Sequence, residues 1–488
     1  MDSQTSQPSQ PSRLLSMPLE VLLHISSYLT TPEYGMLRRT SKHLEASFFK
    51  PFAREFFTKR QFMLTEFSLQ ALVDISKSRF ADYLSHLIIG LERLRLLSSD
   101  PSGQRPQLLV YSTRGEEKYN KYCEAYLDQQ LLHSTGQDLE LLVQALENLP
   151  NLVSIGMRDW NAKYRHRDGQ YAEWRSYGTT TFVQETGVGP INNTFHKNDD
   201  YPPHVFRTIL RALGRTSKSK PGRFEVILRK VSLSESAFHI PQYLEPTVTP
   251  VLANLKTLFL DLNDWVPSAG NSSKLKEFLC KAKSLEHLRL NFQDWDRRNH
   301  HLQTEPGSYL QLLQWLSGDP ASFKNSQALS GIAKPPPDPI KFANLNQIDI
   351  GFVNIEPHEL IKLYTNYKST LRSISLHRVT FCQSKDEEKK NKNQWNGFLD
   401  EISASGLTLL SAISISNPSQ ILYANQKRTS KLDIKFEGAP PRMARSWHGS
   451  DLEQAVKDFK DSIIFDRKAV ENFLEDSWDE GPYTISSC

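Results

Sequence analysis

The sequence predicts an α/β fold in which a short N-terminal helical module is followed by an irregular array of strand–helix repeats. Two patterns predict this fold: apolar residues at helical spacing near the N-terminus, and a Leu-x-x-Leu-x-Leu pattern that recurs over most of the chain. The length of 488 residues agrees with it, because at about 150 residues per domain the chain allows roughly three domains or one long array.

The helical module begins near Arg13. Pro18 suits a first helical turn and Glu20 places a carboxylate near the positive end of the helix dipole, so the pattern predicts a helix over 18–29. Its apolar residues cover an arc of roughly 220°, far wider than the stripe of about 100° that one core requires. They are Leu19, Val21, Leu22, Leu23, Ile25, Tyr28 and Leu29. The helix should therefore bury two surfaces, and the module is too small to cover both.

A second helix should begin near Glu33, after Thr30, Thr31 and Pro32, and continue through Leu44. Residues 13–50 resemble the F-box, a short helical module that docks on a Skp-type adaptor. The resemblance is carried by Met17-Pro18-Leu19-Glu20, Ile25, Tyr28-Leu29, Leu37 and Thr40-Ser41-Lys42-His43-Leu44. Met17 stands where the family usually has Leu, and Glu33-Tyr34 where it often has Asp-Leu.

The resemblance implies a set of apolar residues that contact the adaptor. They are Leu15, Met17, Pro18, Leu19, Leu22, Ile25, Leu29, Leu37 and Leu44. The alternative is an ordinary N-terminal helical hairpin that packs on the rest of the chain, which the wide apolar arc disfavours.

The repeat pattern has seven anchor leucines: Leu84, Leu152, Leu255, Leu285, Leu345, Leu371 and Leu410. The pattern alone is weak, but each copy ends in an alternating, strand-like tail and most follow a helix-like segment. From Leu255 onward the anchors are 30, 60, 26 and 39 residues apart, by subtraction of their numbers. A period of 26 to 30 with one skipped copy and one insertion is typical of leucine-rich repeats, which stack because one repeat cannot bury its apolar face alone.

Further segments complete the organisation. Alternating apolar residues predict strands at 223–231 and 432–438, and helical spacing over 451–478 predicts helices that close the end of the array. The expected arrangement is an N-terminal helical F-box followed by an irregular leucine-rich-repeat solenoid. Its parts are a disordered N-terminus (1–12), the F-box (13–50), a helical linker (51–83), the solenoid (84–440) and a C-terminal helical cap (441–488).

Two stretches, 62–94 and 156–178, look like stretches shared by a group of filamentous-fungal F-box proteins. This resemblance implies a fungal source and a substrate-selecting subunit of a Skp/cullin/F-box ubiquitin ligase, which reaches the cullin through the adaptor and binds a protein substrate. It does not identify that substrate. A leucine-rich-repeat scaffold that binds the adaptor without delivering substrates is the rival interpretation.

The segment 156–178 is the best candidate for a substrate surface, because it interleaves Trp, Tyr and Arg, the residue types that dominate interface hot spots. Trp160, Arg165, Tyr171 and Trp174 are the predicted anchors. Two other interpretations stay open. The segment could be a loop held by its own aromatics and by arginines paired to Asp159, Asp168 and Glu173, or it could stack nucleic-acid bases, which these three acids disfavour.

Charge, cysteine spacing and hydropathy bear on which partners and which kinds of site the protein has. The net charge of +4 is spread over a long chain and does not indicate nucleic acid or an anionic membrane. The cysteines, Cys123, Cys280, Cys382 and Cys488, are about a hundred or more residues apart, which fits neither a zinc site nor a disulfide scaffold. No apolar run reaches the roughly 18 residues that cross a bilayer, and residues 1–12 lack the features of a targeting signal. We expect free thiols, no membrane partner, and a cytoplasmic or nuclear location.

The sequence shows no catalytic site. It has no Gly-x-Ser-x-Gly elbow, phosphate-binding glycine loop or dinucleotide fingerprint, so we expect neither an enzyme nor a cofactor. His300 and His301, with Asp294 and Asp296 nearby, superficially offer metal ligands, but adjacent histidines do not face one point, and no metal is expected. Lone histidines such as His24 and His43 should be surface or interface residues.

Overall fold

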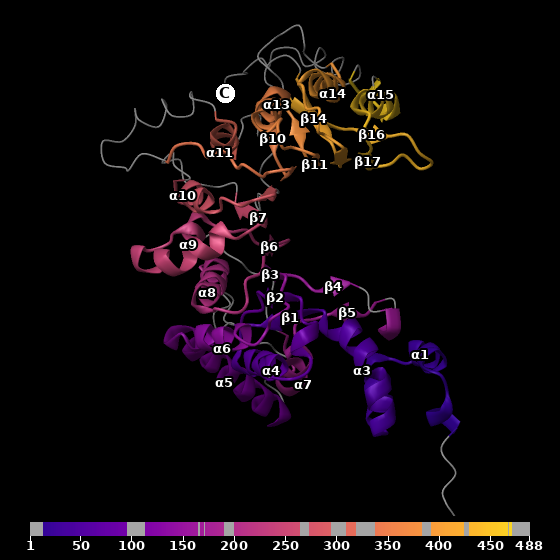
Figure 1. The fold of residues 1–488 in the computed structure, drawn as a ribbon, viewed down its shortest axis with the longest axis vertical. Coiled ribbons are helices and arrows are strands. Elements are labelled where there is room, and N and C mark those ends of the chain that lie inside the picture. Colours follow the sequence, from indigo (N-terminus) through magenta and orange to yellow (C-terminus); the bar gives the residue numbers. More distant parts are fainter. Residues whose placement is uncertain are drawn as a thin grey trace, which may run out of the picture. The chain divides into compact units, whose positions relative to one another are not determined.

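The fold is mixed α/β, with N-terminal helices followed by parallel strands that alternate with helices, as the sequence predicts (Figure 1). The chain divides into two compact units, Met1–Asn192 with Thr216–Ser219, and Asn193–Arg215 with Lys220–Cys488. The structure, a computed structural model, describes residues 13–94, 113–163, 166–169, 171–189, 200–263, 273–293, 309–318, 337–382, 392–423, 429–466 and 468–470.

The first unit begins with a helical module of η1 (Arg13–Ser16), α1 (Leu19–Ser27), α2 (Thr31–Arg39) and α3 (Lys42–Phe57). Side-chain caps set its helix boundaries. Thr30 and Glu33 form a capping box at the start of α2, and the Ser41 hydroxyl accepts a hydrogen bond from the Leu44 amide, 3.1 Å away, at the start of α3. The cap at Ser41 explains why residues 33–44, predicted as one helix, divide between two.

Three parallel strands follow in the order β1-β2-β3: β1 (Lys59–Met63), β2 (His86–Gly90) and β3 (Ser154–Arg158). The unit also contains α4 (Glu66–Ser76), η2 (Ala81–Tyr83), α5 (Thr113–Thr135), α6 (Gln137–Leu146), β4 (Ala162–Lys163), η4 (His166–Asp168), β5 (Glu173–Trp174) and α7 (Thr179–Thr186). Strand β1 lies within the segment 51–83, for which the sequence predicts a helical linker. It is a strand because Phe62 and Met63 are buried beside Ile89 and Gly90 of β2.

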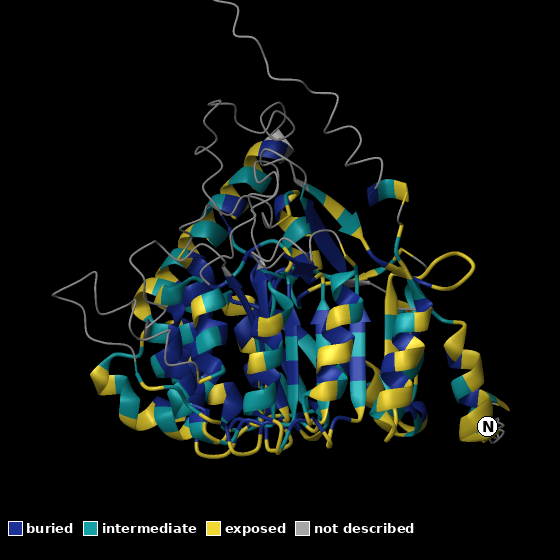
Figure 2. Ribbon diagram, turned by 90° about the horizontal axis from the view of Figure 1, so that it is seen from above, coloured by how far each residue is buried: buried dark blue, intermediate teal, exposed yellow. Residues whose placement is uncertain are grey.

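The second unit contains a parallel sheet in the order β6-β7-β8-β9-β11-β13, with β17 antiparallel at its edge. These strands are β6 (Arg223–Ile227), β7 (Thr257–Asn263), β8 (His287–Gln293), β9 (Gln347–Gly351), β11 (Ser373–His377), β13 (Ala412–Ser416) and β17 (Ala444–His448). Its helices are α8 (Tyr201–Arg215), η5 (Glu235–Phe238), η6 (Gln242–Leu244), α9 (Glu245–Ala253), α10 (Ser273–Lys281), α11 (Tyr309–Leu316), α13 (Pro357–Asn366), α14 (Gln394–Ala404) and α15 (Leu452–Ser462). Many of the helices bury one side and expose the other (Figure 2).

Shorter strands form two further sheets in this unit. One has the order β10-β12-β14-β15, from β10 (Asn354–Ile355), β12 (Thr380–Phe381), β14 (Ser419–Tyr423) and β15 (Thr429–Asp433). The other pairs β16 (Lys435–Phe436) with β18 (Ile463–Ile464). The predicted strand at 432–438 is therefore shared between β15 and β16. The predicted helical cap contains α15 but also β17, and residues 471–488 lie outside the described ranges.

The anchor leucines correctly predict seven strands. Strands β2, β3, β7, β8, β9, β11 and β13 each begin two residues after an anchor, and all seven anchors are buried. In β7 the alternation turns Leu258, Leu260 and Leu262 into the core. The structure thus has the strand–helix alternation of stacked repeats.

The same turn follows three strands. Phe352, Arg378 and Asn417 come directly after β9, β11 and β13, and each has a left-handed backbone, with φ of 60°, 51° and 50°. The first two donate their N–H groups to the carbonyls of His377 (2.9 Å) and Ser416 (2.8 Å) at the end of the next strand. These bonds stabilise a conformation that non-glycine residues rarely adopt, and they lead the chain into the short strands β10, β12 and β14.

Two expectations concern the whole chain. Cys123, Cys280 and Cys382 are free, and Cys488 lies outside the described residues. Burial raises the pKa of the Cys382 thiol to about 12. Of the helices that the structure describes, none combines the length and apolar character needed to span a membrane.

Candidate functional site

The α1–α3 module has its own small core. Leu22, Tyr34, Leu44, Phe48 and Phe56 are buried together, and partly buried residues surround them. Among these are Leu15, Leu29 and Leu37. Five of the nine predicted adaptor contacts therefore serve the fold of the module, Leu22 and Leu44 fully and the other three in part.

The remaining four predicted contacts, Met17, Pro18, Leu19 and Ile25, are exposed. Two further apolar residues are exposed, Val21 of α1 and Tyr28, which caps the C-terminus of α1 and is exposed over 77 % of its surface. Val21, Ile25 and Tyr28 are spaced i, i+4 and i+7, so they form one stripe, which at about 100° per residue is centred about 110° around the helix from the buried Leu22 and Ser26. We call this set the outer stripe. The wide arc of α1 thus divides into a buried side and an exposed apolar side.

The outer stripe includes two residues that the list of predicted contacts omitted. Both belong to the predicted apolar arc, and Tyr28 also carries the F-box resemblance, but the predicted adaptor contacts include neither. Helical spacing from Ile25 would have identified both. His24 lies beside the stripe, with its ring edge-on to Tyr28 at 5.3 Å between centroids, and is exposed, as is His43.

Charged groups of the module are fixed by local contacts. The backbone and side-chain hydrogen bonds from Thr30 lower the pKa of Glu33. Burial lowers the pKa of Arg38, whose guanidinium carbon lies 4.0 Å from the centre of the Phe52 ring. Glu33 therefore lies at the start of α2 and Arg38 over the Phe52 ring, and neither belongs to the outer stripe.

The segment 156–178 contacts the α1–α3 module through Arg167. The Arg167 guanidinium pairs with both carboxylate oxygens of Glu55, at 2.9 and 3.0 Å, and lies 4.5 Å from the centre of the Tyr34 ring. It also donates to the carbonyl oxygens of Ser26 and of Leu29, the latter at 3.1 Å. A single side chain therefore connects α1, α2 and α3.

Asp168 reinforces this contact. Its two carboxylate oxygens accept hydrogen bonds from the Thr31 amide and the Thr31 hydroxyl, both at 2.6 Å, at the start of α2. The positive end of the α2 dipole also stabilises a carboxylate at this N-terminus. The sequence allowed the arginines of this segment to pair with its own acids. Arg175 does lie 3.8 Å from Glu173, but Asp168 accepts its hydrogen bonds from Thr31 of the module.

The predicted substrate anchors lie on both sides of Arg167 and Asp168 in this segment. Tyr171 is 90 % exposed, and Trp160 and Trp174 are half-buried. Arg158 stacks over Trp160 at 4.8 Å, and Trp174 pairs with Ala162 in the β4–β5 hairpin. Arg165 lies outside the described residues, as do His300, His301, Asp294 and Asp296. The structure brings Trp174 into the hairpin and leaves Tyr171 at the surface.

The sheet of the second unit presents a second candidate surface, formed by the residues between the buried leucines. The Phe259 ring lies between the guanidinium groups of Arg289, at 5.3 Å, and Arg223, at 5.8 Å. His287 packs edge-on against the same ring and bonds Asp349, with 2.8 Å between Nε2 and Oδ2. No repeated pattern predicts these residues, because the template specifies only the leucines.

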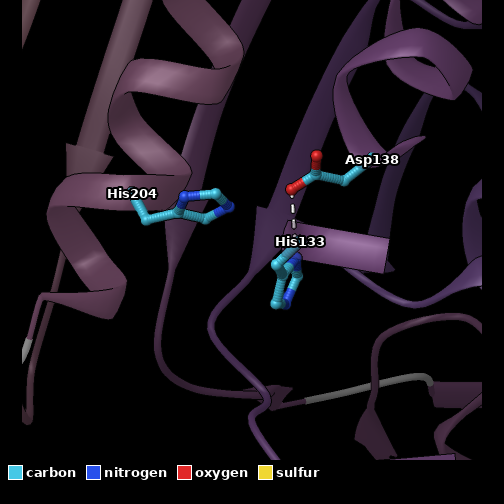
Figure 3. Close-up of side chains that lie close together, drawn as sticks. All are labelled: His133, Asp138 and His204. Atoms are coloured by element: carbon cyan, nitrogen blue, oxygen red, sulfur yellow. Dashed lines mark hydrogen bonds and ion pairs between the residues drawn. The ribbon is translucent and has the colours of Figure 1, made fainter. Parts of the chain in front are cut away.

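A histidine and an aspartate are paired at the junction of α5 and α6. His133 Nδ1 lies 3.0 Å from an oxygen of the buried Asp138, as Figure 3 shows. The other oxygen of Asp138 accepts from the Leu139 amide at 2.8 Å, and Gly136 makes the turn with φ of 74°. This pair stabilises the turn between the two helices.

Comparison with known proteins identifies the N-terminal module. Residues 14–48 match the F-box domain family. The chain contains an F-box domain. No curated protein matches the chain. A crystal structure of the leucine-rich repeat-containing protein LegL7 from Legionella pneumophila matches with 12 % sequence identity, covering 73 % of this chain and 90 % of that chain, at a TM-score of 0.26. A score this low adds nothing to the order of strands and helices described above.

Proposed function

We propose that the F-box of this protein binds a Skp-type adaptor through the outer stripe of α1 together with Met17, Pro18 and Leu19. The observation that carries the proposal is the exposed apolar side of α1 within a matched F-box domain. Exposed apolar patches of this kind mark interaction surfaces. Through the adaptor the protein would join a cullin, as the substrate-recruiting subunit of a ubiquitin ligase. A fungal source, implied by two stretches of sequence, stays a prediction.

The repeats would supply the substrate surface. Tyr171 is exposed beside the residues that hold the F-box, and in the second unit the half-buried Phe259 lies between two arginines. Tyr and Arg are frequent hot-spot residues. Trp160, Arg165 and Trp174 remain proposed anchors with Tyr171.

The test captures partners of the full chain with and without proteasome inhibition. The variant V21D/I25D places two charges on the outer stripe, and L127D/L131D places two charges on an exposed apolar pair of α5 with the same i, i+4 spacing. We expect the wild type and L127D/L131D to capture the adaptor, and V21D/I25D to lose it. A partner that accumulates in ubiquitinated form only with the wild type and the control supports substrate delivery. Adaptor capture without any such partner would support the scaffold alternative.

A further inference from the structure

The first unit contains an open-sided cavity of about 580 Å³, and no residue of the F-box domain lines it. It lies among α4, α5 and α7, which neighbour one another in the fold (Figure 1). A volume of this size falls within the range of about 300 to 1,000 Å³ that is typical of ligand sites. Its apolar lining includes Met63, Leu94, Ala125 and Phe182.

The walls of the cavity are held in place by hydrogen bonds. The buried Gln129 accepts from the Leu94 amide at 2.9 Å and donates to the Leu64 carbonyl at 3.2 Å. Two hydrogen bonds fix the backbone of Tyr177. Its N–H donates to the backbone carbonyl of Gln61 (2.8 Å), and its carbonyl accepts from the Ser68 hydroxyl (2.9 Å). The cavity is therefore preformed, and a ligand would not have to order it.

An aromatic surface opens into this cavity. Phe67 is 57 % exposed and stacks beside Tyr177, with 5.9 Å between ring centroids and 20° between planes. Gly178, at φ +92°, lets the chain pass closely, because an added Cβ would lie 3.2 Å from the Phe67 ring. The exposed face of Phe67 offers the negative quadrupole that attracts cations. Arg60 already lies 5.6 Å from the centre of the Tyr177 ring.

Four carboxylates, all of them on exposed residues, line the open side of the same cavity: Glu66, Asp74, Asp128 and Glu185. Among the residues described, no Lys, Arg or His lines it, and Glu66, Asp128 and Glu185 belong to no ion pair. Lys121 of α5 pairs instead with Glu117, at 2.9 Å, while the charge of Glu185 acts on it more weakly. The N-termini of α4 and α7 each carry about half a positive charge, which disfavours a bound cation. The four carboxylates carry more negative charge than these two helix ends carry positive charge.

We propose that this cavity binds an arginine side chain of a partner polypeptide. A guanidinium group is planar, so it can stack on Phe67 while its N–H groups donate to two carboxylates at the rim. A lysine ammonium lacks this planar fit, and an anionic or purely apolar ligand would meet four negative charges. The proposal extends the protein's recognition beyond the F-box and does not depend on adaptor binding.

The test measures binding of small probes to the full chain by ligand-observed saturation-transfer NMR. We expect acetyl-arginine methylamide to bind at least fivefold more tightly than its neutral isostere acetyl-citrulline methylamide, with the difference reduced at 0.5 M salt. The variant E66Q/D128N/E185Q should lower arginine affinity to the citrulline level, and F67A should lower it by roughly threefold. The variant E20Q/D82N/E116Q removes three exposed carboxylates elsewhere and should change nothing.

Several results would overturn the proposal. One is equal affinity for the arginine and citrulline probes, and another is an effect of E20Q/D82N/E116Q as large as that of the cavity variant. A peptide arm tests the source of the cation: acetyl-Gly-Arg-Gly-amide should bind as tightly as the single residue, and spermidine should bind more weakly. Tighter spermidine binding would assign the cavity to a polyamine. Arg95 and Arg105 follow Leu94 in the sequence and lie outside the described residues. A rise in probe affinity in R95Q/R105Q would instead assign the cavity to an arginine of this chain.

Discussion

Helix α1 and strand β7 use their apolar residues in opposite ways. Every second residue of β7 is a leucine that enters the core, and the residues between them carry polar or aromatic groups. In α1 the apolar residues exceed what the core can take, and Val21, Ile25 and Tyr28 remain outside. The difference teaches that apolar excess, rather than apolar content, marks a docking surface. A binding surface made of the residues between the buried leucines of a strand shows no apolar excess, so the sequence does not reveal it.

The two sides of α1 should respond differently to the same truncation. Leu22→Ala creates a cavity in the module core and should cost about 2–5 kcal/mol of its stability, as buried leucines do. Val21→Ala, on the exposed side, should change stability by less than about 0.5 kcal/mol. Hydrogen exchange of the α1–α3 amides measures both. Equal losses of protection would contradict the division of α1 into a buried and an exposed side.

A buried carboxylate should make the stability of the first unit depend on pH. Burial raises the pKa of Glu92 to about 7, against hydrogen bonds from Ser176 and Gln61 that lower it. The folded state therefore retains a proton that the unfolded state loses at lower pH, so stability falls as pH rises from about 4.5 to 7, by on the order of 3 kcal/mol.

The measurement is the urea midpoint of the wild type and of Glu92→Gln at pH 5 and pH 8. The neutral amide cannot ionise, so its midpoint should vary less between the two pH values than that of the wild type. A wild type and a variant with the same pH dependence would show that Glu92 is not the responsible group.

The contact of segment 156–178 with the F-box should contribute a smaller amount. Arg167→Ala removes the ion pair with Glu55, the bonds to two carbonyls and the stacking on Tyr34, and should lower the stability of the module by about 1–3 kcal/mol. Arg175→Ala removes only a 3.8 Å pair between exposed groups and should change it by less than about 0.5 kcal/mol. Thermal melting compares the two, and similar melting points would show that Arg167 does not hold the F-box.

The sequence predicted the strands better than the sites. Anchor leucines such as Leu255 and Leu371 located strands to the residue, because a buried leucine at a fixed position is a condition of stacking repeats. Strand β1 was missed because its residues, KRQFM, match no template. The partners of Arg167 and Asp168 lie more than a hundred positions away in the chain, and no local pattern encodes such a contact.

Binding of the adaptor to the outer stripe is the central claim, and an affinity titration tests it most directly. The full chain is titrated with a purified Skp-type adaptor, comparing V21A/I25A with L127A/L131A, which truncates an exposed pair at the same spacing on α5. Val21 is 43 % exposed and Ile25 36 % exposed, so burying the remaining surface of both is worth about 1.5 kcal/mol, and V21A/I25A should bind roughly tenfold more weakly. L127A/L131A should bind like the wild type. Equal affinity of all three proteins would contradict the account.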